Sequence, residues 1–446
     1  MFPLPLSEFE HYMYADDRVT SPMTAFMRYR FTGRLERSGF EHAFQAALVL
    51  HPLLRATIVG RPEWRRSRLR WVESAVAPEL NWVPEGEEPR FRESMFIDLQ
   101  RAPGTRLWVR DRSDQSEIIT QLHHACADGL GSLHFVETLL LAYHAQRSGE
   151  DPLSAASVRM DQLASRGMRR LRTWEQVRRI HKGLFRIARY YRSSPQPMAA
   201  QWVRPANVSC PFPPILTAWL EPEETRSVRK AAHQAGATVN SFLLRELLLT
   251  LDDWNRRHGR GSRPLRIVVP VNLREENGLM PACNSVSMSF VDRSPAQLVD
   301  PHELLRNIVA ELDETKNLRR GMALLPIVRL LGMIPGGLKS QLRSDRCLGT
   351  TVFSNLGIPF DRSPLQGPDG RLTAGEVTLE SVEAAPPTRP LTHTTFVVHC
   401  YAGRLGITLR YDPDALREED ADSLLDDFFR RVRESIDVSL AEEAVV

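Results

Sequence analysis

The sequence predicts an α/β protein built from two lobes, with mixed sheets and flanking helices. At 446 residues the chain is longer than one typical hydrophobic core requires, so two lobes are expected. Both halves repeat the order helix, paired strands, closing helix, as judged from helical spacing and from the two-residue alternation of strands. We therefore expect an N-terminal lobe over residues 1–150, a basic helical linker over 151–210 and a C-terminal lobe over 211–446.

Composition narrows the class of protein. A hydrophobic content of 42% and a charged content of 25% are those of ordinary globular proteins, and a net charge of +3 is too small to indicate nucleic-acid binding. The five cysteines are odd in number and lack CxxC spacing, which argues against a disulfide framework or a zinc cluster. The N-terminus lacks the features of a signal peptide, and no apolar run reaches the ~18 residues that span a bilayer. We expect a soluble, cytoplasmic monomer.

In the first lobe, a helix is expected within residues 34–58, because apolar residues recur at helical spacing up to the His51-Pro52 pair. This apolar stripe consists of Phe40, Phe44, Ala47 and Leu48. Residues 60–112 are rich in tryptophan and arginine and predict short strands and loops.

The stretch that carries the chemistry joins a strand to a helix. Residues 117–122, EIITQL, predict a strand, and the apolar spacing that follows predicts a helix ending at Gly149. The helical pattern is formed by Leu133, Val136, Leu140 and Tyr143. His123 and His124 lie between the two elements and should point in opposite directions, because strand side chains alternate faces.

One imidazole at this position suits proton abstraction. A neutral histidine, with an ordinary pKa of roughly 6.5, can take a proton from a hydroxyl or amine that attacks a carbonyl. Asp128 lies four residues beyond His124, and it could orient the imidazole or pair with a distant arginine. Gly129 and Gly131 would let the backbone turn tightly.

The pattern HHxxxDG, made by His123, His124, Asp128 and Gly129, resembles the active-site motif of condensation-domain and chloramphenicol-acetyltransferase-like acyltransferases. That family includes wax ester synthases, alcohol acyltransferases and polyketide-associated acyltransferases. The resemblance implies two chloramphenicol-acetyltransferase-like lobes with an active-site tunnel at their interface, where a donor thioester and an acceptor enter by separate mouths. It also implies that His124 is the catalytic base, whereas His123 and Asp128 are structural.

Other interpretations of this stretch stay open. The two histidines could be structural, and His124 with Asp128 could reach a metal ion, although no third ligand is evident. His123 with Asp128 also matches the HxxxxD spacing of glycerol-phosphate acyltransferases, but the later proline-glutamate-glycine element of that family is missing. Cys126 is interpreted as a packing residue and not as a nucleophile.

The linker carries ten basic residues between Arg166 and Arg192 against the single acid Glu175, with apolar residues at helical spacing. Such a basic amphipathic helix could dock an acidic carrier protein, the phosphates of coenzyme A or a membrane surface. The alternative, a solvated arginine-rich helix that bridges the two lobes, is favoured slightly over docking.

In the second lobe, two helices are expected on either side of residues 236–240, with Thr238 or Asn240 as a cap. Residues 266–274 and 284–287 predict strands. The motif PVNLR resembles a second-lobe strand of the same family, and the resemblance implies that Arg274 is the partner of Asp128. A hairpin is expected over 393–411, with a turn at 402–403, before a closing amphipathic helix over 420–436.

The segment SNLG resembles an element of ester-forming members of the family. Its residues Ser354, Asn355 and Gly357 would line the tunnel, and Asn355 could donate a hydrogen bond to the developing oxyanion. A turn without a direct role is the alternative.

The expected function is transfer of an acyl group from coenzyme A or a carrier protein to a small-molecule alcohol, or less readily an amine. His124 would act as general base, with no covalent intermediate and no bound cofactor or metal. The phosphopantetheine or coenzyme A thioester is a co-substrate. The alternative is a non-catalytic platform that binds carrier protein.

Overall fold

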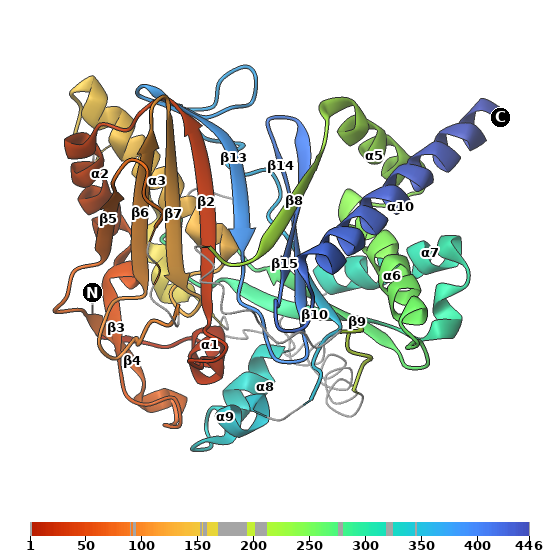
Figure 1. The fold of residues 1–446 in the computed structure, drawn as a ribbon. Helices are drawn as coiled ribbons and strands as arrows, with labels where there is room; N and C mark the ends of the chain where they lie inside the picture. The colour runs from red at the N-terminus through yellow and green to blue at the C-terminus, as the bar shows by residue number, and fades with distance from the viewer. Residues whose placement is uncertain are drawn as a thin grey trace.

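The computed structural model places three sheets with helices packed against them (Figure 1). One sheet has three strands and two have six. The described residues are 2–89, 91, 95–151, 154, 158–167, 194–200, 212–274, 280–317, 324–343 and 346–445.

The first six-stranded sheet has the order β12-β13-β2-β7-β6-β5 and is antiparallel except where β5 pairs with β6. Its strands are β12 (Thr373–Ala374), β13 (Val377–Ala385), β2 (Thr24–Thr32), β7 (Gln115–His123), β6 (Thr105–Arg112) and β5 (Glu79–Val83). Helices α2 (Arg37–Leu50) and α3 (Gly129–Ser148) pack on each other and cover one face of this sheet (Figure 1). The apolar stripe of α2 is buried at Phe40 and Phe44, as the periodicity predicts.

A small sheet of β1 (Leu4–Pro5), β4 (Arg70–Glu73) and β3 (Ala56–Val59) lies next to α1 (Glu8–Asp16). Helix α1 begins with a capping box, in which Ser7 and Glu10 exchange hydrogen bonds with each other's backbone N–H groups. Every residue of α1 is buried, so this helix is an interior element that can contribute to a pocket wall.

The second six-stranded sheet has the order β10-β9-β11-β14-β15-β8, with β11 parallel to both of its neighbours. Its strands are β10 (Val286–Arg293), β9 (Leu265–Asn272), β11 (Thr351–Asn355), β14 (Thr394–Tyr401), β15 (Arg404–Tyr411) and β8 (Ile215–Leu220). Four helices pack together against one face of it (Figure 1). They are α5 (Pro222–Gln234), α6 (Val239–Arg257), α7 (Pro301–Asn317) and α10 (Glu418–Val445).

The structure confirms an α/β fold of two lobes with mixed sheets, and many local predictions hold. Thr238 caps α6 by accepting from Ser241 N–H, and β14 and β15 form the expected hairpin around Ala402 and Gly403. Gly149 ends α3 in a left-handed conformation, with φ of 75°. These features depend on short sequence spacings, and this is why the sequence predicts them.

The sheets depart from the expected division of the chain at residue 211. Strands β12 and β13 belong to the stretch assigned to the C-terminal lobe, yet they extend the first sheet along β2. The β2–β13 ladder holds β13 in the first sheet. An ion pair, in which Arg28 Nε lies 2.6 Å from Glu383 Oε2, joins the same two strands. Pairing between strands about 350 residues apart leaves no local trace in the sequence.

The predicted basic linker helix lies largely outside the described residues. Its first basic residue, Arg166, is described, and its side chain is buried instead of facing solvent or a partner. Arg166 Nε donates to Glu10 Oε1 at 2.6 Å, and Nη2 donates to the carbonyl of Pro5 at 2.7 Å. Arg166 therefore joins the segment after η3 (Met160–Ser165) to α1. Its role is structural, and it does not belong to the exposed basic face that the sequence predicts.

None of the helices in the described part of the chain combines the length and apolar character that crossing a membrane requires.

Candidate active site

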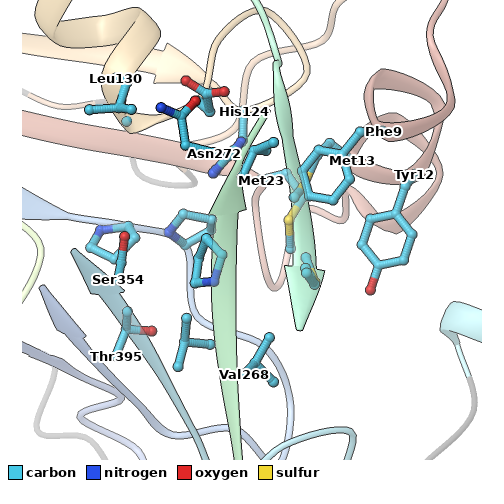
Figure 2. A pocket seen from close by; sticks show the side chains of 18 of the residues that line it. Phe9, Tyr12, Met13, Met23, His124, Leu130, Val268, Asn272, Ser354 and Thr395 are labelled. Atoms are coloured by element: carbon cyan, nitrogen blue, oxygen red, sulfur yellow. The ribbon is translucent and has the colours of Figure 1, made fainter. Parts of the chain in front are cut away.

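His124 lies one residue beyond β7, in the short segment that leads into α3. Its backbone N–H donates to the carbonyl of Met23 at 2.6 Å, which continues the β2–β7 pairing and fixes the residue at the strand end. The side chain reaches a pocket between the two lobes. Figure 2 shows His124 above that pocket, with α1 residues on one side and Ser354 and Thr395 of the second sheet on the other.

His123 points away from this pocket, as strand alternation predicts. Its side chain is fully buried, and Nδ1 accepts a hydrogen bond from the backbone N–H of Ala125 at 3.0 Å. Nε2 lies 3.1 Å from Asp17 Oδ2, a contact between distant residues that no local sequence pattern indicates. His123 thus packs the strand end against the N-terminal segment, while His124 is directed toward the cavity.

Asp128 and Arg274 form a two-pronged ion pair across the lobes. Arg274 Nη1 donates to Asp128 Oδ2 and Nη2 to Oδ1, each at 2.8 Å, and both side chains are at least nine-tenths buried. Backbone N–H groups of Gly131 and Ser285 donate to the same carboxylate. Burial favours the neutral acid, but the Arg274 guanidinium and these donors together lower the pKa of Asp128. The carboxylate is therefore ionised, and its oxygens are occupied by the pair and the helix start.

Gly129 and Gly131 allow close contact between the lobes instead of a tight turn. Both residues are in the first turn of α3. A Cβ on Gly129 would lie 2.8 Å from Leu356 Cδ2, and one on Gly131 would lie 2.9 Å from the carbonyl oxygen of Cys283. A larger residue at either position would push the second lobe away from the motif.

Asn284, just before β10, holds the backbone of His124 and of the residue that follows it. Its Nδ2 donates to the carbonyl of His124 at 2.7 Å and to that of Ala125 at 2.9 Å. The side chain of Asn284 is almost completely buried. From the sequence, Asn284 is expected only on a strand, because nothing in its neighbourhood indicates contact with a segment about 160 residues earlier.

The environment of His124 keeps its ring neutral. Burial lowers the pKa of His124 below the ordinary value of 6.5, and its own backbone and the Asp128 charge offset this only in part. Nδ1 of the ring is buried and has no hydrogen-bond partner among the described residues. A neutral imidazole at physiological pH can accept a proton from a substrate.

Side chains from both lobes line the pocket, and most of them are apolar. Helix α1 supplies Phe9, Tyr12 and Met13 on one side, and Figure 2 shows them facing the strands of the second sheet. That sheet supplies the other wall with Val268, Pro270, Val286, Met288, Val352 and Thr395. Such a wall suits the hydrocarbon part of a substrate.

One part of the pocket wall is polar. Arg389 Nη1 lies 3.0 Å from Asp16 Oδ2 and donates to the Tyr12 hydroxyl at 2.6 Å. These three residues line the pocket and pair with one another, so their charge is compensated within the wall.

Ser354 and Asn355 of the SNLG segment line the same pocket, at the end of β11. Asn355 Oδ1 accepts from Gly357 N–H at 2.7 Å, and its Nδ2 donates to Asn240 Oδ1 at 3.1 Å. Gly357 has φ of 70°, a conformation that favours glycine. The Asn355 amide thus closes a turn, and the donor expected for an oxyanion is already engaged with Asn240.

We compared the sequence with protein families and with known proteins. No protein-family model matches the chain. The sequence is 25% identical over 362 residues to Rv2305, an uncharacterised protein of Mycobacterium tuberculosis, over 77% of this chain and 81% of the relative.

Solved structures match almost the whole chain. The first condensation domain of the calcium-dependent antibiotic synthetase, in complex with a substrate analogue, superposes with a TM-score of 0.67 at 15% identity, covering 98% of this chain and 97% of that domain. The starter condensation domain of rhizomide synthetase, with C8-CoA and Leu-SNAC, gives 0.68 at 15% identity, with coverage of 98% and 94%. The chain has the condensation-domain fold. Polyketide synthase associated protein 5 from Mycobacterium tuberculosis also matches, with a TM-score of 0.63, 16% identity and coverage of 97% and 98%.

The contacts of the motif residues bear on the alternative interpretations of the motif. His123 contacts Asp17 and Asp128 binds Arg274, so the two do not form the histidine–aspartate pair of an HxxxxD acyltransferase. Among the residues that the structure describes, no group of three histidine, cysteine or acidic side chains could hold a metal ion. Cys126 is fully buried, and burial raises the pKa of its thiol, which keeps it protonated.

Proposed function

We propose that the protein transfers an acyl group from an acyl thioester, on coenzyme A or a carrier protein, to the hydroxyl of a small-molecule acceptor. The observation that carries the proposal is the His124 ring, with a lowered pKa, in an apolar pocket between the lobes. A starter condensation domain with C8-CoA has the same fold, which supports a coenzyme A thioester as donor. Coenzyme A or phosphopantetheine enters as a co-substrate and not as a bound cofactor.

In this mechanism His124 is the general base. The neutral imidazole takes the proton of the acceptor hydroxyl as its oxygen attacks the thioester carbonyl carbon. The tetrahedral intermediate then breaks its C–S bond, and the departing thiolate takes the proton back from the imidazolium. Acyl ester and free thiol result, and no covalent acyl-enzyme forms. General base catalysis of this kind contributes about 10²–10⁴ in rate.

The surrounding residues position this base. The Asp128–Arg274 pair fixes the start of α3 against the second lobe, and Asn284 holds the carbonyls of His124 and Ala125. Ser354 and Asn355 form the opposite part of the wall, and we assign Gly357 to the turn that supports them. His123 fixes the strand end from the interior. In the proposed mechanism none of these side chains exchanges a proton with the substrate. Only Ser354 and Asn355 contact it, as part of the pocket wall.

The SNLG segment is the only reason for proposing a hydroxyl acceptor in preference to an amine. The assay therefore compares both kinds of acceptor. Purified protein is incubated with acyl-CoA donors of increasing chain length and with alcohols or amines, and free thiol is measured with a chromogenic reagent. Acceptor-dependent thiol release by the wild type and its loss in His124→Ala are expected.

The matched control is His302→Ala, which removes an exposed histidine on α7. This variant should release thiol as the wild type does. Full activity of His124→Ala would contradict the assignment of the base. Binding of a phosphopantetheinylated carrier protein without turnover of any thioester would instead favour the non-catalytic platform.

A further inference from the structure

A group of exposed apolar side chains lies around the turn between α8 (Leu324–Leu331) and α9 (Gly337–Leu342). Leu330 and Met333 are each 60% exposed and Ile334 is 54% exposed, and Trp64 on a neighbouring loop is 43% exposed. Single exposed apolar residues are common on soluble proteins, but clusters of large ones mark surfaces that bind something. We refer to these four residues as the apolar turn.

Backbone contacts join the two segments that form the apolar turn. The N–H of Gly336 donates to the carbonyl of Glu63 at 2.8 Å, and the N–H of Arg66 donates to the carbonyl of Gly332 at 2.8 Å. Lys339 Nζ lies 3.2 Å from Glu63 Oε2 and adds a salt bridge. Trp64 is therefore held beside the Met333–Ile334 tip. In Figure 1, α8 and α9 lie at the bottom of the view, below α1.

The two chain segments that form the apolar turn carry mostly basic residues. Within the described stretches 60–72 and 324–343, the one acidic residue is Glu63, which is paired with Lys339. The exposed basic residues of these stretches are Arg61, Arg65, Arg68, Arg329 and Arg343. Apolar tips with a tryptophan, surrounded by arginines, match the interface of an anionic bilayer, where apolar groups enter the acyl boundary and cations meet the headgroups.

The same charge argues against a second copy of the chain as the occupant. In a symmetric dimer each surface meets its own copy, so the arginines around one apolar turn would face those of the other. The repulsion between them would oppose association. A membrane rich in anionic lipid has no such conflict.

We propose that the apolar turn docks the protein onto anionic membrane surfaces. Helices α8 and α9 both pack against α1, and α1 supplies Phe9, Tyr12 and Met13 to the pocket wall. Docking by this surface brings the helix that forms the pocket wall close to the bilayer. The docked protein is thereby suited to apolar substrates that partition into membranes. The proposal rests on the surface itself and does not depend on the proposed acyl transfer.

The test is sedimentation of the full chain with vesicles. Vesicles of phosphatidylcholine with added phosphatidylserine should pellet the protein at low salt, whereas pure phosphatidylcholine vesicles should pellet much less. Each arginine near an anionic surface contributes about fivefold in partitioning, so Arg65→Glu with Arg329→Glu should lower binding by well over tenfold. The double variant Met333→Asp with Ile334→Asp should abolish binding, because it places two carboxylates where the chain would enter the bilayer.

Val299→Asp is the matched control, because Val299 is 77% exposed but lies between η4 (Pro295–Leu298) and α7, outside the apolar turn. It should pellet as the wild type does. Vesicle binding that survives in both double variants would overturn the proposal, as would a wild type that fails to pellet with anionic vesicles. Size-exclusion chromatography provides a second check on the wild type and on Met333→Asp with Ile334→Asp. If the wild type is a dimer and the double variant is a monomer, the surface serves self-association, and membrane docking is overturned. Thiol release from short acyl-CoA donors should be unchanged in these variants, which separates this test from that of the base.

Discussion

Arg274 donates a hydrogen bond of 2.8 Å to each carboxylate oxygen of Asp128. This ion pair joins the start of α3 in the first lobe to the segment after β9 in the second. The pair is buried, so each charge relies on the other for compensation. Its contribution is geometric, because it sets how the second lobe meets the loop that carries His124.

Removing one partner of this pair should destabilise the protein. Arg274→Ala or Asp128→Asn leaves an uncompensated buried group, and we expect a loss of about 3–5 kcal/mol in the free energy of unfolding together with a lower rate of acyl transfer. Chemical denaturation and thiol release measure the two effects. Arg37→Ala breaks the exposed Arg37–Glu41 pair and should cost less than about 1 kcal/mol. Equal stability of Arg274→Ala and Arg37→Ala would show that the buried pair is unimportant.

The pH dependence of kcat/KM should reflect the burial of His124. Burial lowers the pKa of His124 below 6.5, so the base is neutral and active above that pH. Activity should therefore be on a plateau near pH 7 and fall only as the pH drops through the lowered pKa, when the ring becomes protonated. Thiol release measured across this range gives the acid limb. A midpoint above pH 6.5 would contradict the assignment.

Asn284 should affect turnover more than binding. Asn284→Ala removes two hydrogen bonds to the carbonyls of His124 and Ala125, so the imidazole is less well oriented. We expect kcat to fall by about tenfold or more with a smaller change in KM, because misplacing a catalytic group by a fraction of an ångström is costly. Asn81→Ala, which removes a hydrogen bond to the Leu107 carbonyl outside the site, is the control. A purely structural role would give lower stability with an unchanged kcat in the folded fraction.

Cys126 should be dispensable for chemistry. The thiol is buried, and its raised pKa keeps it protonated, so it is a poor nucleophile. Cys126→Ala should keep kcat/KM close to wild type, and mass spectrometry of the native protein treated with iodoacetamide should find this thiol unmodified. A loss of several orders of magnitude in Cys126→Ala, with the fold intact, would point to a covalent mechanism.

Short-range patterns allowed much of this protein to be predicted from its sequence. The strand before the two histidines, the helix from Gly129 to Ser148 and the hairpin around Ala402 and Gly403 follow from periodicity and turn residues a few positions apart. The divergence of His123 and His124 follows in the same way from the alternation of a strand. The resemblance to a family suggested Arg274 as the partner of Asp128, which residue spacing alone could not do.

Only the tertiary structure decided which distant segments meet. Asp17 beside His123, Asn284 beneath His124 and β13 in the first sheet all depend on contacts between residues far apart in the chain. Contacts with distant residues also changed the expected role of two side chains, because Arg166 binds Glu10 in the interior and the Asn355 amide is engaged with Asn240. Local sequence determines backbone preference and the faces of helices and strands. The contacts, charges and pKa values of the site depend on packing, which no local pattern encodes.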